Sequence, residues 1–383
     1  MNNYFKIFFS VLRSIAVPVF NFLMLLIGIH FYGKENWGQF INMSLWVYFV
    51  VFIAKWAGQN YLVREFSEKP AKIYTLFYGN FIERSIFLLL SFSFFFIFPT
   101  QIALASIVLL LLIHVYTSFD ALIVYYQLFY IQFLAELIGF LIVSGIIFIY
   151  HSFDLEFIIY LFSVSFLIKI LILVIKLKLP FKKIGVEISI KNCFASFPFF
   201  LIGFSGWLSS KIDVYVVSYF FSKARLSEYQ LLITSFSMLQ AFSSFLISPF
   251  NKHLFRLPKK SIKKIKRTMA IIAFPLVTIA TVCIWLLLEE IIHLRFPFYF
   301  YIVGGLSSVP IFYYIIDIFQ FYRNNGEKQV VKFSFILILI NSILMFIFIP
   351  FFNILGVLMA VCISQWLYLL LIKYEIVKTK KRK

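Results

Sequence analysis

Basic side chains inside long apolar runs are where this sequence could carry chemistry. Five of them lie in such runs: Arg13, Lys55, Arg84, Lys169 and Lys211. A charge near the centre of a bilayer costs about 2.5–3.5 kcal/mol on insertion scales, so we expect these groups to face protein, water or an interface. Cationic groups in a cytoplasm-facing cavity suit an anionic, phosphate-bearing cargo, because arginine binds phosphate with two parallel hydrogen bonds. We therefore expect Arg13, Arg84 and Lys211 to be cavity cations.

The alternatives for these cations are structural. Lys55 and Lys169 are near the ends of apolar runs and are expected to extend toward the membrane surface. Arg84 is a second case, because it could instead pair with Glu83 or Glu136.

Lys211 also has an acidic neighbour, Asp213, two residues away. On a straight helix, residues at this spacing point in directions about 200° apart. One of the two is then expected to face the cavity and the other a helix interface, and Asp213 shares its face with the small residues Gly206 and Ser210.

Motifs for catalysis are missing from the sequence. The five histidines are scattered, and Ser205 lies in Gly-Phe-Ser-Gly, which does not fit the GxSxG spacing of a nucleophile elbow. There is no glycine-rich phosphate loop, and the three cysteines have no metal-binding spacing. We predict a protein that is not an enzyme and that has no cofactor and no metal.

A polar stripe follows one helical face of the run 227–251. Its hydrogen-bonding members are spaced by three or four residues or by sums of these, as on one face of a helix. They are Gln230, Thr234, Ser237 and Ser244, continued by Ser248. The run 5–31 has a thinner stripe that includes Asn21. We predict that both stripes line a wet lumen.

Composition decides the class of fold. The chain has 383 residues, of which 62% are hydrophobic and 13% charged, too apolar for a soluble protein. Spans need about 20 apolar residues each. We predict twelve, at 5–31, 37–58, 74–98, 101–119, 122–149, 155–177, 194–220, 227–251, 268–290, 299–321, 329–350 and 354–374. This is an all-α polytopic membrane protein with two six-helix lobes, 1–180 and 181–383, around a central cavity; the second ends in a basic tail.

The net charge of +19 is explained by topology. With twelve spans, one side receives 26 of the 35 Lys and Arg residues and the other receives 4. The positive-inside rule therefore places both termini in the cytoplasm. We expect the basic segments to lie on anionic membrane lipids and not on nucleic acid.

The two halves of the chain share a short pattern. Residues 32–40 and 221–229 both have an aromatic residue, a lysine two positions later and an aromatic residue six positions after that. Each follows the first span of its half. The match favours a parallel internal repeat, as in some transporters.

Four stretches in order also resemble a known family. They are Gly33 to Phe40 after the first span, Gly58 to Arg64, Pro198 with Lys211, Asp213 and Tyr229, and Asn353 to Ala360 before the last span. On these motifs the chain resembles a polysaccharide flippase of the superfamily that joins multidrug and toxin extruders with oligosaccharidyl-lipid exporters. Asn353 to Ala360 departs from the family's pattern, with its first Gly and one Ala replaced.

The resemblance implies a function and a location. It implies alternating access, with undecaprenyl-diphosphate-linked oligosaccharide units of O-antigen or capsule type moved from the inner to the outer leaflet of the bacterial inner membrane. Arg64 and Asp213 carry over as family-typical residues, and polysaccharide assembly proteins would be partners. The coupling ion, proton or sodium, is left open.

Two alternatives stay open. A cation-coupled multidrug exporter of the same fold would use membrane-embedded acids, for which Asp213, Glu136 and Asp317 are candidates. A membrane-embedded glycan polymerase or acyltransferase would need long external loops, and the predicted external loops are short.

Overall fold

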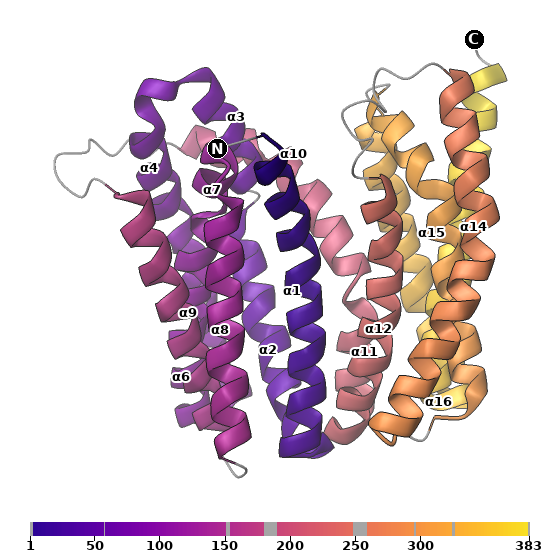
Figure 1. Cartoon of the computed structure of the whole chain (residues 1–383), viewed down its shortest axis with the longest axis horizontal. Coiled ribbons are helices and arrows are strands. Elements are labelled where there is room, and N and C mark those ends of the chain that lie inside the picture. The colour runs from indigo at the N-terminus through magenta and orange to yellow at the C-terminus, as the bar shows by residue number, and fades with distance from the viewer. Residues whose placement is uncertain are drawn as a thin grey trace. The chain divides into compact units, whose positions relative to one another are not determined.

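The computed structural model describes residues 3–56, 58–150, 154–179, 190–247, 259–294, 296–323 and 326–381. Within these ranges all regular structure is helical (Figure 1). The chain forms two compact units, an N-terminal unit of Met1–Phe204 and a C-terminal unit of Ser205–Lys383. The predicted division between 180 and 181 falls outside the described residues and stays a prediction.

The N-terminal unit contains a series of helices. In chain order they are α1 (Asn3–Tyr32), α2 (Lys34–Lys55), α3 (Gly58–Glu68), η1 (Pro70–Lys72), α4 (Ile73–Ser85), η2 (Ile86–Ser93), α5 (Phe94–Ile97), α6 (Thr100–Ser118), α7 (Asp120–Tyr126), α8 (Phe129–Ile149), α9 (Leu155–Leu177) and α10 (Ile190–Ser209), which runs across the boundary. Helix α1 packs along α8, while α9 contacts both α6 and α8. The η2 segment is a 3₁₀-helix within the predicted third span.

The C-terminal unit has fewer and longer helices. They are α11 (Ile212–Phe220), α12 (Lys223–Ile247), α14 (Lys259–Leu286), η4 (Leu287–Ile291), α15 (Phe298–Arg323) and α16 (Glu327–Lys381). Helix α15 packs against α12, α14 and α16. Helix α16 is two helices joined at Asn353, whose backbone is non-helical (φ 53°, ψ −135°). The turn predicted between the last two spans is therefore present.

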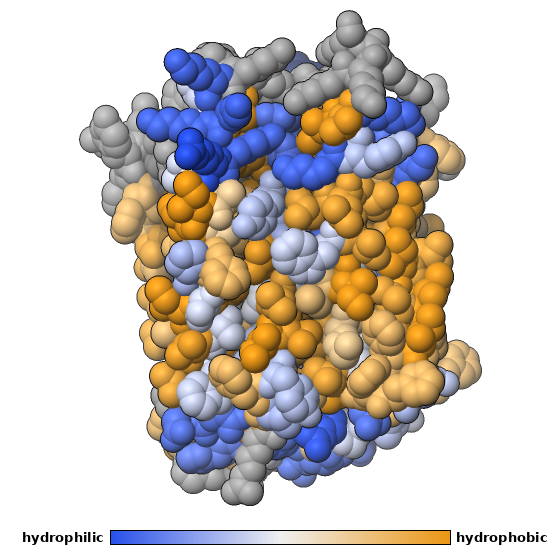
Figure 2. Space-filling view, turned by 90° about the vertical axis from the view of Figure 1, so that its right-hand side faces the viewer, coloured by the Kyte–Doolittle hydropathy of each residue, from blue (hydrophilic) through white to orange (hydrophobic). Residues whose placement is uncertain are grey.

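Length and hydropathy confirm a polytopic all-α protein. In the described ranges nine helices are long and apolar enough to cross a membrane, or ten if the bent pair Phe194–Ser209 and Ile212–Phe220 is one span. One of the nine, Lys328–Lys378, contains the last two predicted spans. Helix α12, which carries the polar stripe, is not among the nine. On the face shown in Figure 2, hydrophobic residues cover the middle and hydrophilic residues gather at the two ends.

The two segments of the predicted repeat have similar local structures. Both are short turns between helices, one around Gly33 and the other around Ser222. In each, the first turn of the next helix is closed by a backbone hydrogen bond, from Trp37 N to Gly33 O (3.1 Å) and from Leu226 N to Ser222 O (3.0 Å). The later aromatic residue of each segment, Phe40 or Tyr229, is buried. The matched aromatics thus anchor the second helix of each pair.

Candidate functional site

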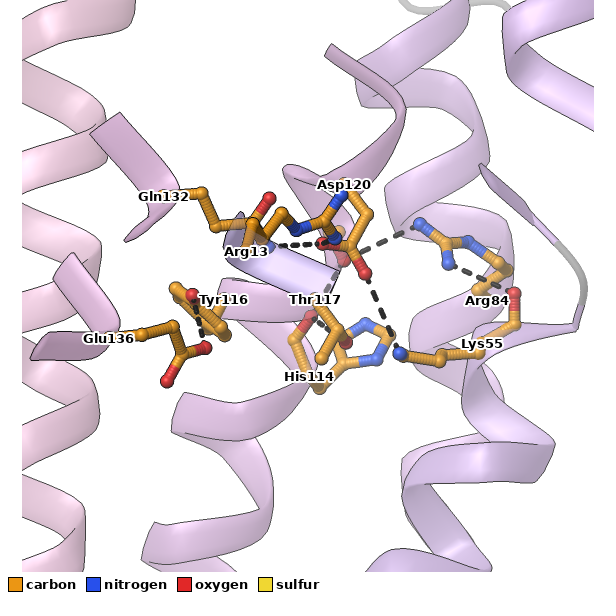
Figure 3. A network of polar contacts seen from close by, with 10 residues as sticks. Arg13, Lys55, Arg84, His114, Tyr116, Thr117, Asp120, Gln132 and Glu136 are labelled. Carbon is orange, nitrogen blue, oxygen red and sulfur yellow. Dashed lines mark hydrogen bonds and ion pairs between the residues drawn. The ribbon is translucent and has the colours of Figure 1, made fainter. Parts of the chain in front are cut away.

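The centre of the candidate site is Asp120, the first residue of α7. Helix α6 ends at Ser118, and the short break before α7 brings the Asp120 carboxylate between two cations (Figure 3). Arg13 Nη2 of α1 lies 3.8 Å from Asp120 Oδ1, and Lys55 Nζ at the end of α2 lies 3.6 Å from Oδ2. Gln132 Nε2 of α8 donates a hydrogen bond of 3.0 Å to Oδ1. Four helices therefore converge on one carboxylate.

The two cations of this cluster are partly exposed. The side chains of Arg13, Lys55 and Asp120 are 23%, 38% and 11% exposed, respectively. Ion pairs at 3.6–3.8 Å that are partly open to water are weaker than hydrogen-bonded buried pairs. A proton, another cation or an anionic cargo can therefore compete for these groups. Arg13 and Lys55 are predicted intramembrane cations, and the structure brings them together.

Arg84 is 2% exposed, and its guanidinium makes its hydrogen bonds to other groups of the protein. Its guanidinium donates hydrogen bonds to Lys55 O (3.0 Å), Asn80 O (3.2 Å) and Ser118 Oγ (3.4 Å). The bond to Lys55 O satisfies a carbonyl at the C-terminal end of α2, which has no partner within its own helix. A Cβ at Gly58 would lie 2.7 Å from Arg84 Nη1, so the glycine makes room for the guanidinium. Arg84 acts here as a brace, and its predicted role as a cavity cation is not supported by this burial.

Lys169 and Glu136 form a second pair in the N-terminal unit. Lys169 Nζ lies 2.7 Å from Glu136 Oε2, and Tyr116 OH donates a hydrogen bond of 2.6 Å to Glu136 Oε1. The ammonium also lies 4.5 Å from the centre of the Phe166 ring. Lys169 is buried because this carboxylate and ring compensate its charge, so the prediction that it extends to the membrane surface is wrong. Gly139 of α8 leaves the space that the lysine occupies.

Lys211 lies at a break in the helix. Helices α10 and α11 meet at an angle of 47° on either side of Ser210 and Lys211. The expectation that Lys211 and Asp213 point away from one another assumes a straight helix. This assumption is wrong, because the helix is broken at Lys211. Asp213 itself is buried and accepts a hydrogen bond of 2.8 Å from Tyr229 OH of α12. This agrees with the prediction that Asp213 faces a helix interface, whereas the cavity role of Lys211 stays a prediction.

Asp317 of α15 is the most enclosed acid of this group, with a fully buried side chain. It pairs with Lys266 of α14 and with Lys373 of α16, whose Nζ lies 2.9 Å from Oδ2. Lys266 also donates to Gln320 Oε1 at 3.2 Å. These contacts join three helices of the C-terminal unit.

The remaining predicted residues are more scattered. Gln230 Nε2 donates to Thr234 Oγ1 at 3.2 Å, so the two are neighbours on α12, and Ser237 is exposed on the same helix. Asn21 is exposed on α1. The side chain of Ser244 and residue Ser248 lie outside the described part. The lumen assignment stays a prediction.

Arg64 lies on α3, outside the long apolar helices. It is 63% exposed, and its Nε donates a hydrogen bond of 3.0 Å to Glu68. This contact raises the pKa of Arg64 above its already high ordinary value. The family-typical role of Arg64 stays a prediction. Among the described residues there is no group of His, Cys, Asp and Glu side chains that could hold a metal ion.

Asp120 is the residue that the sequence did not reveal. It falls between the predicted spans 101–119 and 122–149 and is therefore absent from the predicted membrane-embedded acids. An Asp directly after an apolar run, with Arg13 and Lys55 unpaired in sequence, is the signal that could have identified it.

Comparison with known proteins gives the fold. No family model and no curated protein matches the chain. Among solved structures it is similar to the eukaryotic MATE transporter AtDTX14, with a TM-score of 0.58, 12% identity and coverage of 97% of this chain and 95% of the other. It is also similar to an inward-facing multidrug resistance MATE family transporter of the MOP superfamily (TM-score 0.53, 12% identity, 97% and 99% covered). For the MATE multidrug transporter DinF-BH, the values are 0.52, 12%, 97% and 94%.

These likenesses establish a MATE-like fold with two lobes. They agree with the resemblance at the level of the fold. They do not extend to the lipid-linked oligosaccharide flippase.

Proposed function

We propose that this chain is a multi-pass membrane transporter that exports an amphiphilic organic cargo by alternating access, with a cation-coupled multidrug exporter as the first candidate. The neighbours by fold include proteins described as multidrug transporters, which favours this candidate over the glycan flippase. The sequence alone ranks the two candidates in the opposite order.

The observation that carries the proposal is the pair of long ion pairs that join the Asp120 carboxylate to the partly exposed cations Arg13 and Lys55. A cation-coupled exporter needs a membrane-embedded acid that can gain and lose its ion. Asp213 is buried against Tyr229, Glu136 is held by Lys169 and Tyr116, and Asp317 is fully buried between two lysines. The ion pairs of Asp120, at 3.6–3.8 Å, are longer than the 2.7 Å pair of Glu136, and its partners Arg13 and Lys55 have side chains that are 23% and 38% exposed. We therefore assign ion coupling to Asp120 and not to the three acids first considered.

Arg13 and Lys55 would control this acid in the transport cycle. With Asp120 ionised they are held by it; when Asp120 takes up a proton, the attraction is lost and both side chains are released. Because they lie on α1 and α2, protonation would loosen the contact of these helices with α7. This is a local change of charge that an alternating-access cycle can use.

The second candidate is the flippase for undecaprenyl-diphosphate-linked oligosaccharide. A specific observation favours it: the cluster around Asp120 holds Arg13 and Lys55 against a single carboxylate, with Arg84 beside them. This local excess of positive charge suits a diphosphate, which could displace Asp120 from its two partners. The two candidates use the same residues with opposite charge requirements.

The test is transport by the purified chain in vesicles, with two variants of opposite charge. A cationic dye and a diphosphate-linked glycolipid are offered in separate assays under an imposed proton or sodium gradient. For the multidrug exporter, Asp120→Asn should reduce dye efflux by at least tenfold, and Arg13→Gln with Lys55→Gln should also reduce it, because these two cations control the acid. For the flippase, the double variant should abolish glycolipid flipping.

Matched controls remove similar charges elsewhere in the N-terminal unit. Asp154→Asn alters an exposed carboxylate just before α9, and Lys69→Gln with Lys72→Gln removes two exposed cations between α3 and α4. If the wild type transports neither the dye nor the glycolipid, both candidates are contradicted. Efflux unchanged by Asp120→Asn contradicts the coupling role of Asp120.

A further inference from the structure

A cleft at one end of the C-terminal unit is lined by both ends of α16. It has a volume of about 310 Å³. Its lining residues are Lys328, Gln329, Lys332, Phe333, Glu375 and Lys378. The bend at Asn353 folds α16 back on itself, which brings its first and last turns to the same place. The cleft is thus built by residues from the two opposite ends of one long helical segment.

The cleft is positively charged. Three ammonium groups face one carboxylate, so its formal charge is +2. Lys328 and Lys332 are one helical turn apart and share a face of α16. All three lysines are exposed, and in the part of the chain that the structure describes no ion pair joins them to a carboxylate. Lys266 and Lys373 differ in this respect, because both form ion pairs with Asp317.

Apolar surface lies along the two arms of α16 that build the cleft. Phe333 is buried and belongs to a core cluster with Leu337, Tyr368 and Ile372. On the outside of the same helix, Leu339 and Leu370 are each 61% exposed. A ligand with a charged head and long apolar tails could therefore place its head in the cleft and its tails along α16. A small free anion would leave this apolar surface unused.

We propose that this cleft, hereafter the basic cleft, binds the headgroup of an anionic phospholipid whose acyl chains lie against α16. Basic pockets between membrane helices are suited to such headgroups. Three lysines provide the hydrogen bonds and charge for one phosphodiester. Phosphatidylglycerol has a phosphodiester and a net negative charge and is the probe of choice, whereas phosphatidylcholine is zwitterionic, because its choline group offsets the charge of the phosphate. The proposal does not depend on which cargo is transported.

The experiment measures phospholipid retained by the purified full chain. Phosphatidylglycerol and phosphatidylcholine with identical acyl chains are titrated in detergent, and bound lipid is counted by native mass spectrometry. Lys328→Gln with Lys332→Gln and Lys378→Gln should weaken phosphatidylglycerol binding by at least tenfold, because each lysine near a headgroup contributes several-fold in affinity. The control, Lys260→Gln with Lys263→Gln and Lys264→Gln, removes the same charge from exposed positions on α14 and should change it less than twofold.

Three results would overturn the proposal. The first is equal retention by the cleft variant and the wild type, and the second is an equal loss in the control. The third is displacement of the bound lipid by millimolar inorganic phosphate, which would indicate a site for free anions. Thermal unfolding of each variant checks its fold. If the triple variant unfolds, phosphatidylglycerol binding is measured for Lys332→Gln alone, which lies at an exposed position.

Discussion

Asp120 of the N-terminal unit and the acids Asp317 and Asp213 of the C-terminal unit are held in different ways. In the N-terminal unit, Asp120 lies 3.6–3.8 Å from two partly exposed cations, Arg13 and Lys55. In the C-terminal unit, Asp317 is fully buried between two lysines, and Asp213 is buried against Tyr229. Long ion pairs with partly exposed partners can exchange partners at little cost in free energy. Buried ion pairs cannot lose one partner without leaving the other charge uncompensated. The contacts of Asp120 are therefore suited to a change of ion-pair partner, whereas the contacts of Asp317 and Asp213 are suited to hold helices together.

The strongest test of this contrast is Asp317→Asn. It would leave Lys266 and Lys373 without their common carboxylate, and breaking a buried pair costs on the order of 3 kcal/mol. We expect a marked fall in the thermal unfolding midpoint of the purified protein. Asp120→Asn should lower it much less, because water can solvate the released cations. Similar destabilisation by both variants would contradict the contrast.

A smaller effect is expected from Tyr229→Phe. Removing the hydroxyl leaves the buried Asp213 carboxylate without this donor, at a cost of about 1–3 kcal/mol. Tyr219→Phe is the control, since Tyr219 is 83% exposed on α11. Thermal unfolding measured side by side should separate the two. A midpoint unchanged by Tyr229→Phe would show that the hydrogen bond does not stabilise the C-terminal unit.

The smallest effect concerns the hydrogen bond from Arg84 to the backbone of Lys55. Gly58→Ala would push on the Arg84 guanidinium, and we expect a loss of about 1–2 kcal/mol from the strain of an added methyl group. Gly145→Ala in α8 meets no atom within 4 Å and should be neutral or stabilising by up to about 1 kcal/mol. If both variants unfold at the wild-type midpoint, Arg84 does not hold the end of α2 in place.

The class of fold could be read from the sequence because it depends on composition alone. Apolar runs of about 20 residues predict membrane helices, and Asn353 and the Gly33 segment predict turns that the structure contains. The pairing of the charges could not be read in this way. Lys169 pairs with Glu136, which is 33 residues away in the sequence, and Lys373 pairs with Asp317, which is 56 residues away. Such pairs depend on which helices are neighbours, and this information is not local.

The break at Lys211 shows a second reason. The prediction for Lys211 and Asp213 assumes a continuous helix, and Ser209 and Ser210 give no clear sign of a bend. Arg84 is likewise interpreted from its charge in the sequence, whereas the structure uses it to cap the carbonyl of Lys55. A charged residue in a span is a sign of importance, but its partners decide whether it serves binding or packing.

The bend in α16 has a consequence for how the chain enters a membrane during synthesis. No charged residue occurs between Phe333 and Ile372, and the tip of the bend carries the exposed residues Phe351 and Phe352. The two arms can therefore insert together as one hairpin, because its leading end takes no charge across the bilayer. The lysines before and after it stay on the side from which the hairpin entered. The lining of the basic cleft would then be assembled by insertion itself, before the rest of the C-terminal unit packs.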